Sequence, residues 1–130
     1  MDFDVHNSQM GAFIGRWSPT ILNVTLEGAN EDAVRKSVIY ESSFGCDFLL
    51  SPKLPNATDV IPIDRFDEIF TVLRRMYDVI VIDTSVEYRN DLLSKLVYPM
   101  SDKIVYVATL DRPSIMNMRR WILFTGTSRG

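Results

Sequence analysis

The hydrophobic positions of the chain form short apolar runs separated by longer amphipathic stretches. The clearest run is 77–83, in which β-branched residues follow one another without polar alternation, as is typical of a strand buried on both faces of a parallel sheet. Residues 103–109 have the same character, 46–50 form a third run, and 1–5 look like the end of a fourth that the chain start cuts short. The pattern therefore predicts four strands.

Helical periodicity lies between these runs. In 63–76, apolar residues recur at three- and four-residue steps and charged residues occupy the other side, which predicts an amphipathic helix. Helices are also predicted over 31–38, 90–96 and 113–124. Strands that alternate with helices imply βαβ crossovers. We therefore expect an α/β fold, a mostly parallel sheet with flanking helices, in one domain over 1–130.

The composition narrows the class of protein. The 130 residues carry a net charge of −3 and are 46% hydrophobic and 24% charged, as in an ordinary globular domain, and their scattered Lys and Arg give no nucleic-acid signal. There is no signal peptide and no run of about 18 apolar residues that would predict a transmembrane segment, so we expect a cytoplasmic protein. Cys46, the single cysteine, is predicted to be a small buried hydrophobe, and His6 has no neighbours for a metal site.

Three acidic residues lie at the ends of apolar runs. Asp2 and Asp4 stand two apart near the chain start, and Asp83 ends the run 77–83. Ligands of open parallel sheets bind beyond the carboxyl ends of the strands, where these carboxylates would suit Mg²⁺ or would orient an attacking water. Taken singly, each has a simpler interpretation, with Asp83 capping the turn after its strand and Asp4 acting as a turn acid.

Taken together and in order, the motifs resemble a known family. The sequence Tyr-Asp-Val-Ile-Val-Ile-Asp-Thr-Ser at 77–85 resembles the Walker B strand and second switch of the MinD/ParA family, and Met-Asp-Phe-Asp-Val at 1–5 resembles its first switch. Residues 9–15 are similar to the family's next helix and loop, and 103–114 to the strand and Pro-containing helix start after Walker B. The resemblance extends over 1–124 and is closest to the CpaE/TadZ pilus-assembly branch.

The resemblance implies a P-loop NTPase (Rossmann-like) domain that uses ATP and Mg²⁺. By position, Asp4 would be the catalytic residue that positions the attacking water, and Asp83 would hold Mg²⁺ through a water. Asp2, Asp83 and Thr84 would belong to the nucleotide site, with Asp2 supporting the first switch. The implied partner is a second copy in a homodimer or a partner protein, and the implied cargo is pilus or septum machinery or DNA.

Two departures from the family pattern limit what the chain is expected to do. Residues 84–87 read Thr-Ser-Val-Glu in place of the usual Thr-Pro-Pro-Gly. None of the six glycines precedes a Lys, so the phosphate-binding loop is missing. We therefore expect a truncated switch domain that binds no nucleotide and hydrolyses no ATP by itself. Without the missing strand, two apolar strands would leave backbone groups unpaired.

Other readings stay open. A degenerate, non-hydrolysing interaction module on the same fold would keep the acids as relics. A phosphoacceptor receiver domain would also place an acid pair at one strand end, Asp83 at another and Thr109 at the next. However, Asp4 and Asp83 lie farther apart in the sequence than a receiver domain allows. The apolar residues of 113–124 predict core packing, with a partner contact as the alternative.

Overall fold

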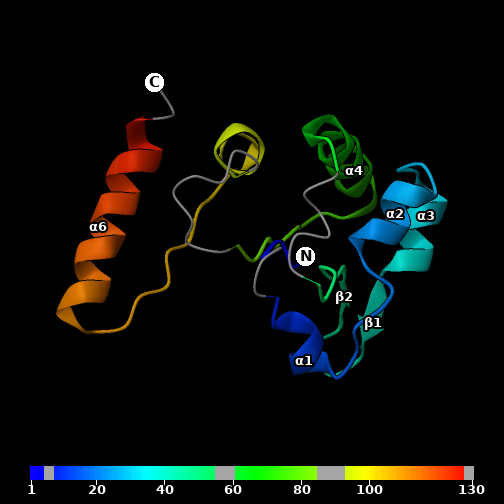
Figure 1. Cartoon of the computed structure of the whole chain (residues 1–130), viewed down its shortest axis with the longest axis horizontal. Helices are drawn as coiled ribbons and strands as arrows, with labels where there is room; N and C mark the ends of the chain where they lie inside the picture. Colours follow the sequence, from blue (N-terminus) through cyan, green and yellow to red (C-terminus); the bar gives the residue numbers. More distant parts are fainter. Residues whose placement is uncertain (5–7, 55–60, 85–92, 128–130) are drawn as a thin grey trace. The chain divides into compact units, whose positions relative to one another are not determined.

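The computed structural model describes residues 1–4, 8–54, 61–84 and 93–127 of the chain, in two units, 1–87 and 88–130. Unit 1 contains α1 (Met10–Ile14), α2 (Ile21–Leu26), α3 (Glu31–Ser37), β1 (Ile39–Glu41), β2 (Cys46–Phe48) and α4 (Ile63–Met76) (Figure 1). Unit 2 contains a π-helix (Leu93–Val97), α5 (Tyr98–Met100) and α6 (Arg112–Thr127).

The predicted α/β fold with a mostly parallel sheet, a truncated Rossmann-like P-loop domain, is wrong. The described residues are rich in helix, and their sheet is the antiparallel pair β1 and β2. Parallel pairing among them is limited to two isolated bridges, Asp2 with Asp83 and Thr20 with Leu50. Apolar β-branched residues favour an extended backbone, but a parallel sheet also needs a neighbouring strand over several consecutive residues. The N-terminal residues and residues 81–83 are hydrogen-bonded over too short a length to form a parallel sheet.

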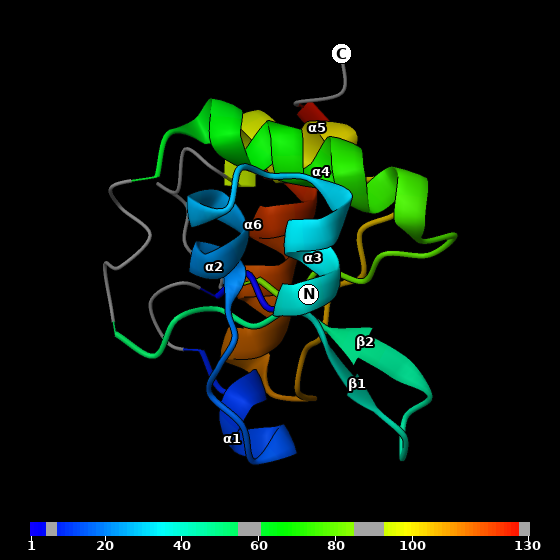
Figure 2. The same cartoon turned by 90° about the vertical axis from the view of Figure 1, so that its right-hand side faces the viewer.

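The hairpin of β1 and β2 pairs Glu41 with Cys46 across its turn. Gly45 has a φ of 65°, a left-handed conformation that glycine adopts without a steric penalty, and its N–H donates to the Glu41 carbonyl over 2.9 Å. Figure 2 shows the turn pointing away from α2, α3 and α4. Cys46 is exposed at this turn, so the prediction that it is buried is wrong.

Helix α4 confirms the helix predicted over 63–76 with the same bounds. Asp64 lies in its first turn, and Arg74 and Arg75 lie in its last turn, where each charge opposes the helix dipole favourably. The centre of its apolar stripe is buried, as the periodicity requires. The buried residues are Phe66, Ile69, Phe70, Val72 and Leu73.

The other predicted helices agree with the structure to different degrees. The helix predicted over 31–38 is α3, and the one predicted over 113–124 lies within α6. Of 90–96, residues 90–92 lie outside the described part of the chain, and the rest belongs to the π-helix rather than to an α-helix.

Phe3 anchors the N-terminal segment on α4. Its ring centroid lies 5.4 Å from that of Phe66, with the rings at 77°, and 5.6 Å from that of Phe70. All three rings are buried, and edge-to-face packing of this kind is favourable beyond the area it buries. Helices α2 and α3 contact α4 as well, and they bury Val24 and Val34 (Figure 1). The core of unit 1 therefore holds the segment that carries Asp2 and Asp4.

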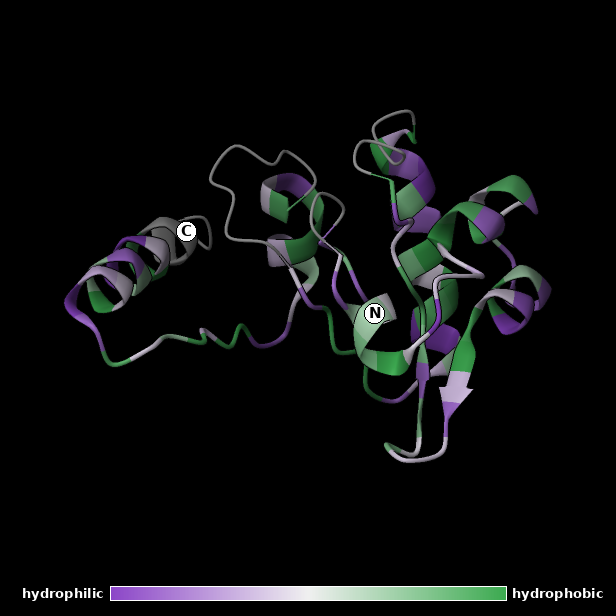
Figure 3. Cartoon of the chain, turned by 60° about the horizontal axis from the view of Figure 1, so that its bottom comes forward, coloured by the Kyte–Doolittle hydropathy of each residue, from purple (hydrophilic) through white to green (hydrophobic). Residues whose placement is uncertain are grey.

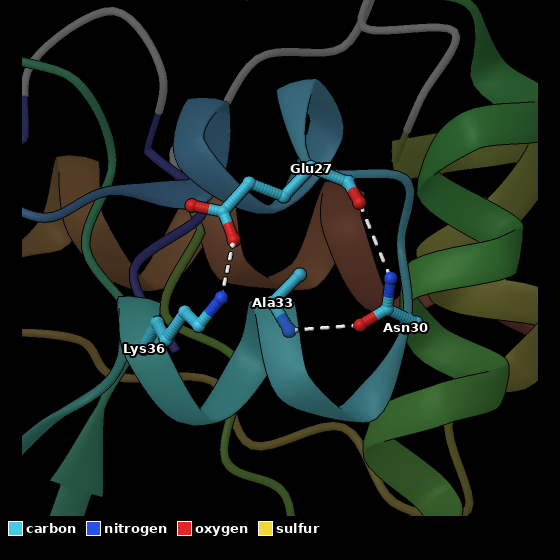
Figure 4. Close-up of polar contacts among 4 residues, drawn as sticks. All are labelled: Glu27, Asn30, Ala33 and Lys36. Atoms are coloured by element: carbon cyan, nitrogen blue, oxygen red, sulfur yellow. Dashed lines mark hydrogen bonds and ion pairs between the residues drawn. The ribbon is translucent and has the colours of Figure 1, made fainter.

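Asn30 fixes the start of α3 (Figure 4). Its Oδ1 accepts a hydrogen bond from the Ala33 N–H at 2.9 Å, and its Nδ2 donates to the Glu27 carbonyl at 3.2 Å. Lys36 forms an exposed ion pair with Glu27 at 3.3 Å. The first N–H groups of a helix lack intrahelical acceptors, so the cap contributes more to stability than this solvent-screened pair.

Unit 2 buries Trp121 of α6, whose ring centroid lies 6.2 Å from that of Tyr98. Four other apolar residues of α6 are exposed: Ile115, Met116, Ile122 and Leu123. Core packing of this helix is therefore confirmed for Trp121 and wrong for these four. The connection 103–110 that leads into α6 also carries hydrophobic residues (Figure 3). Among them, Val107 is 96% exposed. Among the residues described, no helix has both the length and the apolar character needed to cross a membrane.

Candidate functional site

The N-terminal segment lies between residues that are far away in the sequence. The Asp2 N–H donates to the Leu49 carbonyl at 2.9 Å, and the Phe3 N–H donates to the Asp83 carbonyl at 2.8 Å. In return, the Asp83 N–H donates to the Met1 carbonyl at 2.9 Å. These bonds place Asp2 beside Asp83 in a parallel bridge. Two of the acids proposed from sequence are thus brought together although the parallel sheet is absent.

The Asp2 carboxylate is engaged within the chain. Its Oδ1 accepts from the Asp4 N–H at 3.1 Å, its Oδ2 accepts a short hydrogen bond from the Ser8 hydroxyl, and the residue is 1% exposed. Burial raises the pKa of Asp2 above its ordinary value. The hydrogen bonds from Ser8 and Asp4 oppose this increase in pKa, and the charges of Asp83 and Asp4 add to it. Asp2 therefore holds the backbone at Asp4 in place.

The Asp2 carboxylate is not free to bind Mg²⁺ in this arrangement. Both Asp2 oxygens already accept hydrogen bonds, and burial keeps the carboxylate from the waters that Mg²⁺ retains. Asp4 is half-buried, Asp83 is exposed and Thr84 is half-buried beside it. In the described ranges, no group of three or more His, Cys, Asp or Glu residues is arranged to hold a metal ion. The rest of the predicted second switch, residues 85–87, and His6 lie outside these ranges.

Residues 79–83 form an extended segment with one paired side. The Val81 carbonyl accepts from the Met1 amino group at 2.6 Å, and both backbone groups of Asp83 bond to Met1 or Phe3. Backbone groups of an extended chain alternate in direction, so those of Ile80 and Ile82 face the other side. No hydrogen bond joins them to any residue in the described part of the chain. We call the backbone groups of Ile80 and Ile82 the outer edge.

Apolar side chains surround the outer edge. Val79 and Val81 are 77% and 73% exposed. A hollow of about 60 Å³ opens beside them, and Val38, Leu49 and Leu73 supply its apolar wall. The remaining lining residues are Met1, Asp47, Tyr77, Val79, Ile80 and Val81.

Two polar residues that line the hollow, Asp47 and Tyr77, are hydrogen-bonded to each other. The Tyr77 hydroxyl donates to Asp47 Oδ2 at 2.7 Å. Burial raises the pKa of Tyr77 to about 12, and the hydrogen bond to Asp47 and the charge of that carboxylate act in the same direction. The phenol is therefore neutral at physiological pH and remains a hydrogen-bond donor. This contact connects the residue that ends α4 with β2.

The sequence alone indicated part of this site. It placed acids at the ends of the two apolar runs that meet here, and it anticipated unpaired backbone groups in such runs. It did not reveal the hollow or the contact between Tyr77 and Asp47, because the contact joins residues 30 positions apart and the hollow is lined by residues as far apart as Met1 and Val81. The Ser-Ser-Phe-Gly stretch at 42–45 is the signal that would have identified the hairpin carrying Asp47, because a short connection that contains glycine is typical of a hairpin.

The chain was also compared with known proteins. Comparisons with models of protein families, with curated proteins and with solved structures found no match to it.

Proposed function

We propose that residues 1–130 bind and position a partner protein and do not hydrolyse ATP by themselves. The observation that carries this proposal is the outer edge, whose backbone groups have no hydrogen-bond partner among the described residues and lie next to the exposed side chains of Val79 and Val81. Unpaired strand edges and exposed apolar residues are the features through which proteins recruit other chains. A cytoplasmic location is part of the same proposal.

The acids support a structural role rather than hydrolysis. Asp2 uses its carboxylate to bind Ser8 and the Asp4 N–H, so it stabilises the turn of its own segment. The glycines of the chain do not form the Gly-rich loop with a following Lys that cradles a triphosphate. We expect titration calorimetry with Mg-ATP to detect no saturable binding. Micromolar binding together with turnover would contradict the proposal.

Partner binding is tested by site-specific photocross-linking in cells that make the protein. A photoreactive residue at Val79 should give a discrete adduct, because this side chain lies beside the outer edge. The same residue at Asp67, exposed on α4, is the control and should give none. Identical adduct patterns from both positions, or no adduct from Val79, would refute a partner-binding role for this surface.

A second candidate is an ATPase switch of the MinD/ParA type in which these residues are one segment of a longer chain. The position of Asp2 beside Asp83 favours it, because the resemblance assigns these two acids to neighbouring switches. In that case the coding sequence upstream of Met1 specifies a Gly-rich loop with Lys-Ser or Lys-Thr. The extended protein should then bind Mg-ATP, and Asp4→Ala should slow hydrolysis more than it weakens binding.

A further inference from the structure

We infer that the outer edge binds an extended polypeptide segment with an apolar, β-branched centre and basic residues at both ends. The inference rests on the proposed partner-binding function and specifies the chemistry of the partner. Three properties of residues 78–83 support it: their backbone groups, the adjoining hollow and the charges at their ends.

The backbone groups define the class of ligand. Ile80 and Ile82 each present an N–H and a carbonyl on the same side, at the repeat distance of an extended chain. Another extended backbone satisfies all four groups at once, which is the basis of strand addition in peptide recognition. The bonds of Val81 and Asp83 to Met1 and Phe3 already hold the segment extended, so binding needs little further ordering of it.

The hollow defines what the side chains of the partner must be. Its wall is formed by Val38, Leu49 and Leu73, and Val79 and Val81 border it. A cavity of about 10–15 Å³ already holds one water molecule. The hollow of about 60 Å³ therefore has room for several heavy atoms of an aliphatic side chain. Alternate side chains of an added strand point to the same face, so one β-branched residue can enter the hollow while the residues two positions away from it cover Val79 and Val81.

The charges disfavour a second copy of this segment as the partner strand. Asp78 and Asp83 stand at its two ends, and both are exposed. Antiparallel pairing of two copies through the outer edge would set Ile80 opposite Ile82, which brings Asp78 of one copy and Asp83 of the other to the same end of the pair. Like charges directly opposite each other destabilise strand pairs, whereas opposite charges stabilise them. A strand with Lys or Arg at both ends is therefore the complementary ligand.

The first test uses two short, blocked, fluorescent peptides with the same alternating Val and Thr centre. One carries lysines at both ends and the other carries glutamates. By fluorescence anisotropy at low salt, the lysine peptide should bind about tenfold more tightly, from two favourable end pairs set against two unfavourable ones. Asp78→Lys should reduce or reverse this preference. Equal affinity for the two peptides overturns the requirement for basic ends, and no binding of either peptide overturns strand addition.

The second test removes one donor of the outer edge. Ile80→Pro deletes the N–H of Ile80 and places the proline ring where the added strand would lie, so affinity for the lysine peptide should fall at least about tenfold. Val81→Pro is the matched control, because the N–H of Val81 faces the Met1 side and the outer edge stays intact. Circular dichroism establishes that both variants fold. Equal loss of affinity in the two variants contradicts the assignment of the edge.

A negative result in the peptide tests can be distinguished from a negative result in the cross-linking experiment. An adduct at Val79 without binding of either peptide leaves the partner-binding function in place and refutes the extended, basic-ended ligand. If Ile80→Pro does not fold, the comparison of the two peptides on wild type and Asp78→Lys still decides the inference.

Discussion

The Tyr77 hydroxyl donates a hydrogen bond to Asp47 Oδ2 over 2.7 Å, and this bond joins the end of α4 to β2. The N–H of Tyr77 also donates to the Leu73 carbonyl at 2.9 Å, so both ends of the residue are fixed. Residues 79–83 begin two positions later. Tyr77 therefore sets the direction in which the extended segment leaves the helix. It also forms part of the wall of the hollow beside that segment.

The substitution Tyr77→Phe should lower the free energy of unfolding by about 1 kcal/mol, because it removes a hydrogen bond while keeping the ring. Urea denaturation followed by circular dichroism measures the change. Tyr40→Phe is the control, since this ring is exposed on β1 and should give a much smaller effect. Equal effects of the two substitutions would show that the contact with Asp47 adds nothing to stability.

The pKa of Asp2 predicts a pH-dependent effect of Asp2→Asn. Burial raises the folded-state pKa above the ordinary value of 3.8, so the contribution of Asp2 to stability falls as the pH rises through the interval above 3.8. Asparagine can still accept from the Asp4 N–H and contact Ser8, but it carries no charge. Denaturation at pH 4 and pH 7 should show the variant gaining stability relative to wild type at pH 7. A relative gain at pH 4 instead would contradict the account.

Truncation of Phe3 tests the anchor of the N-terminal segment. Phe3→Ala leaves a cavity against Phe66 and Phe70 and should cost about 3–5 kcal/mol. Phe44→Ala is the matched control, because this ring is 54% exposed at the hairpin turn and should cost far less. Thermal unfolding of both variants supplies the comparison, and similar losses would show that Phe3 is not a core residue.

The cap of α3 makes a smaller and separate contribution. Asn30→Ala removes the acceptor for the Ala33 N–H and should destabilise unit 1 by about 1 kcal/mol. Lys36→Met removes only the exposed ion pair with Glu27 and should change the stability by less than about 0.5 kcal/mol. Chemical denaturation that ranked the two substitutions in the opposite order would contradict this interpretation of the cap.

The sequence predicts local structure here better than long-range pairing. Helix α4 was predicted with its observed bounds because its apolar residues follow the helical period and its charges suit the helix ends. The β-branched run 77–83 indicated an extended backbone, but a partner strand depends on residues elsewhere in the chain. The run meets Met1 and Phe3 over a few bonds and leaves Ile80 and Ile82 unpaired in the described part of the chain.

The candidate site was predicted in the same partial way. Acidic residues at the ends of two apolar runs correctly suggested that Asp2 and Asp83 would be neighbours. Their roles could not be predicted, because they depend on burial and on the side chains of other segments. The Ser8 hydroxyl and the Asp4 N–H both donate hydrogen bonds to the Asp2 carboxylate. Cys46, an apolar residue by type, lies exposed at a turn.

Amide hydrogen exchange measured by NMR tests the central claim most directly, because it reports on each backbone N–H separately. In the free chain, the Asp83 amide should exchange slowly, since it donates to the Met1 carbonyl, and the Ile80 and Ile82 amides should exchange rapidly. Saturating lysine peptide should slow exchange at Ile80 and Ile82 and leave Asp83 unchanged. Slow exchange at Ile82 in the free chain, or no added protection with the peptide bound, would contradict the outer edge as a binding site.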